Sequence, residues 1–130
     1  MSGVEEFDYV RRDDRERLAA LAPDERLSLK LYDRASGADR VAVSLIRTPA
    51  GGGSPEGLHV HAFEQVFYVL EGAMCVEVDG RTFEVGPGDV VVFPEGAPHR
   101  NWTTADEPTL HVAINAPAPK LGEKMARPVA

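Results

Sequence analysis

Hydrophobic and polar residues alternate along most of the chain after residue 26, and short polar turns separate the alternating runs. Leu27, Leu29 and Leu31 share one face of an extended segment, and the run 41–47 repeats the alternation after a turn at 36–39. These two runs predict a hairpin. Further runs continue to residue 116 with evenly spaced Gly and Pro turns, and no parallel βαβ unit is visible. The pattern therefore predicts an all-β fold, a sandwich or barrel of antiparallel strands.

The pattern also divides the chain into three segments. Residues 1–26 are predicted to be a lead-in with one short helix near 13–22, where Asp13 and Glu16 have the spacing of a capping box. Residues 27–117 are predicted to form the barrel, and residues 118–130 a loosely held C-terminal arm. At 130 residues the chain is expected to be one domain overall.

Composition and charge exclude several classes of partner. The net charge is −7, which argues against nucleic acid or an anionic membrane surface. No apolar run has the length of a membrane span, and the charged N-terminus does not resemble a signal peptide. The single cysteine excludes an intrachain disulfide. We expect a soluble, cytoplasmic protein.

The segment 57–72 contains most of the candidate ligand-binding residues. His59, His61 and Gln65 have the same parity, so in an extended segment they project to one side together with Phe67 and Val69. A polar cluster in an apolar wall is typical of a ligand site.

His99 lies on a separate predicted hairpin. A single histidine in a strand is more often a hydrogen-bonded or surface residue than a metal ligand, and a His-x-His pair alone is a weak signal. Three imidazoles from two strands, however, suit a first-row divalent metal. The fourth histidine, His111, lies in the last long strand and either lines the pocket or is a surface residue.

Two motifs make the sequence resemble the cupin superfamily. The first is Gly53, five residues, His59-Val60-His61, three residues, Gln65, six residues, Gly72. The second is Gly88, five residues, Pro94-Glu95-Gly96, two residues, His99. The position of the family's final Asn holds Thr103. The resemblance covers roughly residues 40–116 and is specific for the fold rather than for the function.

The resemblance implies a fold and a metal. The fold is a double-stranded β-helix, the jelly-roll barrel of two antiparallel sheets. The metal ligands implied are His59, His61, Gln65 and His99, and the ion could be Fe, Mn, Ni, Zn or Cu. The family pattern has Glu where this chain has Gln65. A neutral amide leaves the ion its full charge, so the site should hold its metal less tightly and attract anionic oxygens more strongly.

The function that follows is a metal-dependent enzyme acting on a small organic molecule, of the dioxygenase, isomerase, lyase or decarboxylase type. The predicted pocket-lining residues are Phe63, Phe67, Val69, Trp102 and His111, and no catalytic base is identified. The alternatives are a non-catalytic module that binds a sugar or organic acid, and a structural metal protein.

A homodimer is also predicted. Val66, Tyr68 and Leu70 form a second apolar face on the strand that carries Gln65. A strand that is apolar on both faces is buried on both, so this face should meet another sheet or another subunit. Exposed sheet edges, such as the early hairpin, also favour pairing between copies.

Overall fold

The fold is a barrel of two antiparallel sheets, as the alternating pattern predicts. The structure is a computed structural model that describes residues 7–104 and 106–129. The helix of the described residues is α1 (Arg15–Ala19), and a single 3₁₀ turn follows at Arg34–Ser36. The strands are β1 (Leu27–Tyr32), β2 (Ala42–Thr48), β3 (His59–Val60), β4 (Glu64–Glu71), β5 (Met74–Val78), β6 (Arg81–Val85), β7 (Val90–Phe93), β8 (His99–Thr103), β9 (Thr109–Ala116) and β10 (Arg127–Pro128).

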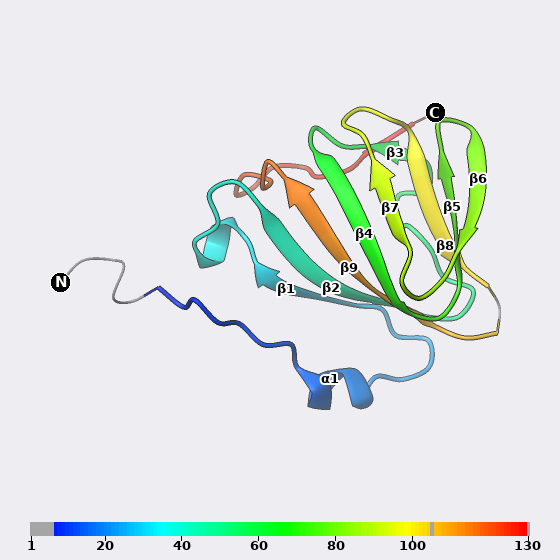
Figure 1. Cartoon of the computed structure of the whole chain (residues 1–130), viewed down its shortest axis with the longest axis horizontal. Coiled ribbons are helices and arrows are strands. Elements are labelled where there is room, and N and C mark those ends of the chain that lie inside the picture. The colour runs from blue at the N-terminus through cyan, green and yellow to red at the C-terminus, as the bar shows by residue number, and fades with distance from the viewer. Residues whose placement is uncertain (1–6, 105, 130) are drawn as a thin grey trace.

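The strands form two five-stranded sheets. The first sheet has the order β1-β2-β9-β4-β7 and the second the order β10-β3-β8-β5-β6, and every pairing between these strands is antiparallel. Figure 1 shows the first sheet as a broad layer with the strands of the second sheet beside and behind it. This arrangement confirms the all-β prediction and the predicted hairpin of β1 and β2.

The hydrophobic core lies between the sheets. Inward-facing side chains of both sheets pack together there, because successive residues of a strand alternate between its two faces. The buried members are Phe67, Val69, Met74, Val76, Val91, Phe93 and Ala113. This apolar cluster occupies one part of the interior and leaves the rest of the barrel for polar side chains.

The predicted strand around residues 58–70 is in fact two strands in different sheets. His59 lies in β3 of the second sheet, and Gln65 lies in β4 of the first. Residues 61–63 connect them without belonging to either strand. Although the chain crosses from one sheet to the other here, both segments direct their odd-numbered side chains into the barrel, where His59 and Gln65 are buried.

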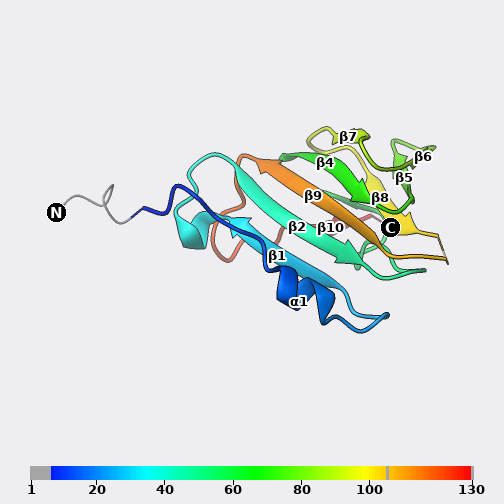
Figure 2. The same cartoon turned by 60° about the horizontal axis from the view of Figure 1, so that its bottom comes forward.

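The N-terminal helix is shorter than predicted, and its cap differs. The side chain of Asp14, not Asp13, accepts a hydrogen bond from the Arg17 amide, while Asp13 forms an ion pair with Arg15. In Figure 2 the helix is drawn below β1, and its residues Arg15, Leu18 and Ala19 border a surface pocket together with Arg47 of β2 and Leu110 of β9. The segment after it is fixed by Arg47 of β2, which donates to the carbonyl oxygens of Ala22 and Glu25. The first six residues of the predicted lead-in lie outside the described residues.

The C-terminal arm contributes a strand. β10 pairs with β3, so that Pro128 lies opposite His59, and the Val129 amide donates to the carbonyl oxygen of Leu58. Ala118 and Ala126 are buried. The sequence pattern suggested a loose arm because two-residue strands leave no alternation to detect. Ala130, the last residue of that segment, lies outside the described residues.

The outer face of the first sheet carries exposed apolar residues, and we expect it to pair two copies of the chain. Tyr68 and Val90 are paired across β4 and β7, and together with Leu70 and Val92 they are 37–58% exposed. Burying apolar surface contributes about 25 cal/mol per Å². Light scattering at micromolar concentration should therefore give twice the chain mass of 14.1 kDa.

Two variants test this surface. Val92→Asp places a charge in the paired face and should give a monomer with unchanged circular dichroism. Leu121→Asp changes a residue that is 73% exposed outside this face and should remain a dimer. A wild-type monomer at micromolar concentration would contradict the prediction.

Candidate functional site

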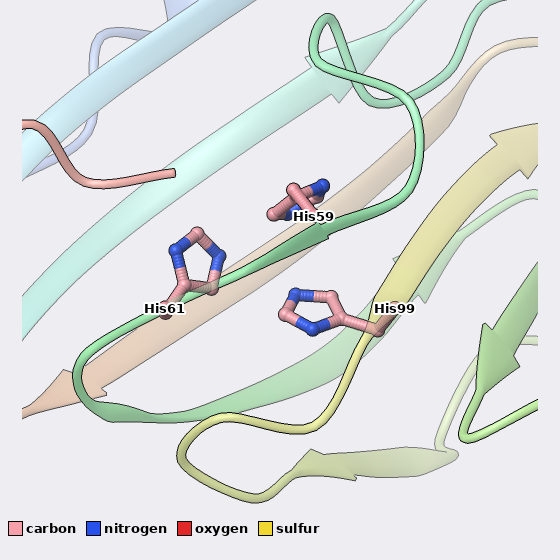
Figure 3. Close-up of side chains that lie close together, drawn as sticks. All are labelled: His59, His61 and His99. Atoms are coloured by element: carbon pink, nitrogen blue, oxygen red, sulfur yellow. The ribbon is translucent and has the colours of Figure 1, made fainter. Parts of the chain in front are cut away.

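Three histidines from different parts of the chain meet inside the barrel. His59 comes from β3, His61 from the crossing that follows it, and His99 from β8, where it lies directly opposite His59. One ring nitrogen of each lies within 4.8 Å of the corresponding nitrogens of the others. Figure 3 shows the three rings gathered around one space between the strands. All three side chains are buried.

Backbone carbonyl groups hold each imidazole in one orientation. The Nδ1 atoms of His59, His61 and His99 donate to the carbonyl oxygens of Gly57, Met125 and Ala97, at 2.6, 2.6 and 2.9 Å. A carbonyl oxygen can only accept, so Nδ1 carries the proton in each ring and Nε2 keeps its lone pair. This is the tautomer that binds a metal through Nε2.

The surroundings also favour the uncharged form of two of these rings, those of His61 and His99. Burial lowers the pKa of His61 below its usual value, although Met125, Glu56 and Gln65 favour the charged ring and oppose the shift. Burial, followed by the neighbouring His59 and His61, lowers the pKa of His99 to about 4. Three imidazoles with ring nitrogens gathered at one space could hold a metal ion.

His99 provides the sharpest test of whether these residues fit a metal. Its Nε2 is buried and has no hydrogen-bond partner among the described residues. Leaving a buried polar atom unpaired costs roughly 1–3 kcal/mol. A divalent ion bound by the lone pair would satisfy it, and the donor set of three imidazoles suits such an ion.

Gln65 lies next to this cluster and is oriented by a residue that the sequence analysis did not single out. Its Nε2 donates to Oδ1 of Asn115 on β9 at 2.8 Å, and both side chains are buried. The bond directs the amide nitrogen away and leaves the amide oxygen for the histidines. Asn115 shares its parity with His111 on the last long strand, which is the signal that could have identified it.

The histidines open into a cavity of about 300 Å³. Its wall includes His59, His61, Gln65, Phe67 and His111. Further polar and charged side chains complete the wall: Arg26, Ser28, Lys30, Ser44, Thr48, Ser54, Glu56, Asn101 and Asn115. The sequence analysis did not anticipate the charged ones, Arg26, Lys30 and Glu56.

Three of the predicted wall residues lie elsewhere. Val69 is fully buried in the hydrophobic core, and Phe63 stacks on the ring of His61 with centroids 4.5 Å apart. Trp102 is on the opposite face of β8 from His99, where the guanidinium of Arg100 lies over its ring. Strand parity explains Trp102, because positions 99 and 102 of one strand face opposite sides.

Burial of His99 and His111 predicts that the metal-free protein loses stability as the pH falls from about 6.5 to about 4. Burial, followed by the charge of Arg26, also lowers the pKa of His111 to about 4. Between these pH values the unfolded chain binds protons that the folded chain does not. The free energy of unfolding therefore decreases as the pH is lowered. Each histidine accounts for up to about 3 kcal/mol.

Urea unfolding of the metal-free protein at about pH 7 and about pH 4.5 measures this loss. The variant His111→Phe removes one of the two groups and should lose less stability over the same interval. Equal losses in the variant and the wild type would show that His111 is not held neutral by the fold.

Comparisons with known proteins agree with this architecture. A family model described as "Cupin domain" matches residues 44–115, which is more than half of the chain. An uncharacterized protein of Methanocaldococcus jannaschii is 39% identical over 49 residues. That match spans 37% of this chain and 39% of the relative, so it covers less than half of the relative's length.

Solved structures share the fold over most of the chain. The polyketide cyclase RemF from Streptomyces resistomycificus is 32% identical, with a TM-score of 0.67, over 82% of this chain and 72% of that one. A protein of Thermus thermophilus is 27% identical, with a TM-score of 0.69, over 85% of this chain and all of that one. Within the described residues of this chain, no helix is long and apolar enough to cross a membrane.

Proposed function

The chain belongs to the cupin family, and on that basis we propose that it is an enzyme that acts on a small organic anion with one divalent transition-metal ion. His59, His61 and His99 would hold the ion through Nε2, and Gln65 through its amide oxygen. The observation that carries the proposal is the buried Nε2 of His99, which has no partner among the described residues and belongs to three imidazoles with ring nitrogens within 4.8 Å of one another. An ion there would supply Lewis acidity that polarises a carbonyl or carboxyl oxygen of the substrate.

The charges around the cavity favour an anionic substrate. Arg26 and Lys30 line the cavity together with one acidic residue, Glu56, although the whole chain has a net charge of −7. Gln65 adds no negative charge where the family pattern has Glu. The cavity therefore concentrates positive charge in an acidic protein, and this charge attracts a small anion.

The size of the cavity bears on the class of substrate. About 300 Å³ is at the lower end of the range for small-molecule sites. The likeness to a polyketide cyclase supports a substrate with carbonyl groups, but the volume favours a molecule smaller than a long polyketide.

Glu56 is the residue we propose as the proton-transfer group. It lines the same cavity, and its charge acts on His61. A carboxylate within reach of a polarised carbonyl can remove a proton from the neighbouring carbon. The sequence analysis found no base because Glu56 lies in the glycine-rich loop rather than on a strand.

Metal analysis and turnover test the proposal together. The purified protein should contain close to one equivalent of a transition metal, and small oxo acids should be consumed, with or without uptake of O₂. Glu56→Gln should keep the metal and lose turnover. Metal binding and tight anion binding without turnover of any tested acid would favour a non-catalytic binding module instead.

A further inference from the structure

His111 is a buried histidine that the metal site does not use. It is 1% exposed, and neither of its ring nitrogens has a hydrogen-bond partner among the described residues. Its side chain lines the cavity. Burying unpaired polar atoms is costly, so a residue that keeps two of them beside a cavity is suited to a ligand that pairs them.

The packing separates His111 from the three-histidine cluster. Its ring contacts Phe67, with centroids 4.2 Å apart, Phe67 contacts Phe93, and Phe93 stacks on His99. The group of ring nitrogens within 4.8 Å of one another contains His59, His61 and His99 but not His111. Along β9, His111 is four residues from Asn115, or about 13 Å of extended chain. His111 is thus not a fourth imidazole of the metal site.

The first sheet places further polar groups in the same part of the cavity. His111 lies opposite Ile46 on β2, and Ile46 lies opposite Ser28 on β1. In the neighbouring row, Lys30 lies opposite Ser44. Ser28, Lys30 and Ser44 all line the cavity, and Arg26 precedes them on the same parity. The cavity therefore has two polar ends, one at the three histidines and one on the inner face of β1, β2 and β9.

We propose that His111 is the second binding point of the cavity and that it hydrogen-bonds an oxygen of the substrate at the end remote from the three-histidine cluster. The substrate class that fits is an elongated organic anion with an oxygen-bearing group at each end. This inference rests on the proposed function for the end bound at the metal. Arg26 and Lys30 supply the positive charge for the remote end.

The protonation state of His111 is consistent with this role. Burial, followed by the charge of Arg26, lowers the pKa of His111 to about 4, so the ring is neutral near pH 7. A neutral imidazole offers one N–H donor and one acceptor nitrogen. It can therefore bind a carboxylate, carbonyl or hydroxyl oxygen without bringing a second positive charge into the buried wall.

Calorimetric titration with simple acids tests the proposal. Linear dicarboxylates of four to seven carbons and monocarboxylates of the same lengths are titrated into the zinc-loaded protein. The best dicarboxylate should bind at least about tenfold more tightly than its monocarboxylate partner, a gain of about 1.4 kcal/mol. His111→Phe should abolish this advantage with the zinc content unchanged, and His111→Gln, which keeps a donor and an acceptor, should retain part of it.

The control and a second measurement keep the result interpretable. Lys120→Gln removes an exposed cation outside the cavity and should bind all probes as the wild type does. Nitrogen NMR should show the ring signals of His111 shifting when the best dicarboxylate is added. An unchanged dicarboxylate advantage in His111→Phe, or unmoved His111 signals in the bound wild type, would overturn the proposal.

Failure of the metal proposal would give a different pattern. If the protein binds no zinc, the comparison is repeated without metal. A loss of carboxylate binding in His111→Phe but not in His99→Phe then supports the role of His111 and rejects only the metal. Equal binding by both variants and the wild type rejects the role of His111.

Discussion

A His99→Phe variant should lose metal binding almost completely while its metal-free form remains as stable as the wild type. Removing groups that only support metal ligands costs roughly 10–100-fold in affinity, so removing a ligand should cost at least about a hundredfold. The apo protein, in contrast, loses the Nδ1 hydrogen bond to the Ala97 carbonyl but also gives up a buried Nε2 that has no partner among the described residues, and the two effects oppose each other. A phenyl ring keeps the stacking on Phe93.

Metal content after dialysis and thermal melting of the metal-free form measure the two effects separately. His111→Phe is the matched control, because it also replaces a buried cavity histidine by Phe and should keep its metal. Below about pH 6 the His99→Phe protein should exceed the wild type in stability, since it lacks a ring that the folded state keeps neutral. A His99→Phe protein that binds metal as tightly as the wild type would show that the histidine cluster is not the metal site.

Replacing Gln65 with Glu should raise metal affinity and lower the affinity for anions. The two side chains are nearly isosteric, so the fold should not change. The added carboxylate attracts the ion, and a unit charge about 4 Å away contributes about 4 kcal/mol for each unit of the ion's charge at the effective dielectric of a protein surface, part of which desolvation offsets. We therefore expect at least about a tenfold gain in metal affinity and a comparable loss in the affinity for carboxylate probes.

Asn115 affects the interpretation of the Gln65→Glu result, because it is the hydrogen-bond partner of Gln65. In the wild type it accepts a hydrogen bond from Gln65, and a glutamate could not donate one. The Asn115 amide can turn over and donate its own N–H to the new carboxylate. The double variant Gln65→Glu, Asn115→Leu removes that partner and isolates the effect of charge. If Gln65→Glu binds metal no better and anions just as well, Gln65 does not contact the ion.

Strand parity predicted much of the site from the sequence. It placed His59, His61, Gln65 and Phe67 toward one interior, and the structure brings all four to the barrel interior. This succeeded although the supposed single strand is two strands in different sheets. The odd-numbered residues face the interior on both sides of the crossing, because the inner faces of the two sheets border the same space.

The sequence could not reveal contacts that depend on register between distant strands. Arg26 and Lys30 reach the cavity because β1 pairs with β2 and β2 with β9, and nothing local to residues 26–30 specifies that order. The acceptor for His61 is a backbone carbonyl, that of Met125, which any residue type could provide. Val69 and Phe67 share a parity and both belong to the core cluster, but only Phe67 also lines the cavity, so parity alone does not separate core residues from cavity residues.

The hydrogen bond between His61 and Met125 has a kinetic consequence. Met125 precedes β10, and the described ladder between β10 and β3 consists of two residue pairs. Short segments of this kind open locally far more often than whole domains unfold. Each opening frees the Nδ1 proton of His61 and lets the ring rotate or exchange tautomer. The residence time of a bound ion should therefore follow the opening rate of β10 rather than the unfolding rate of the barrel.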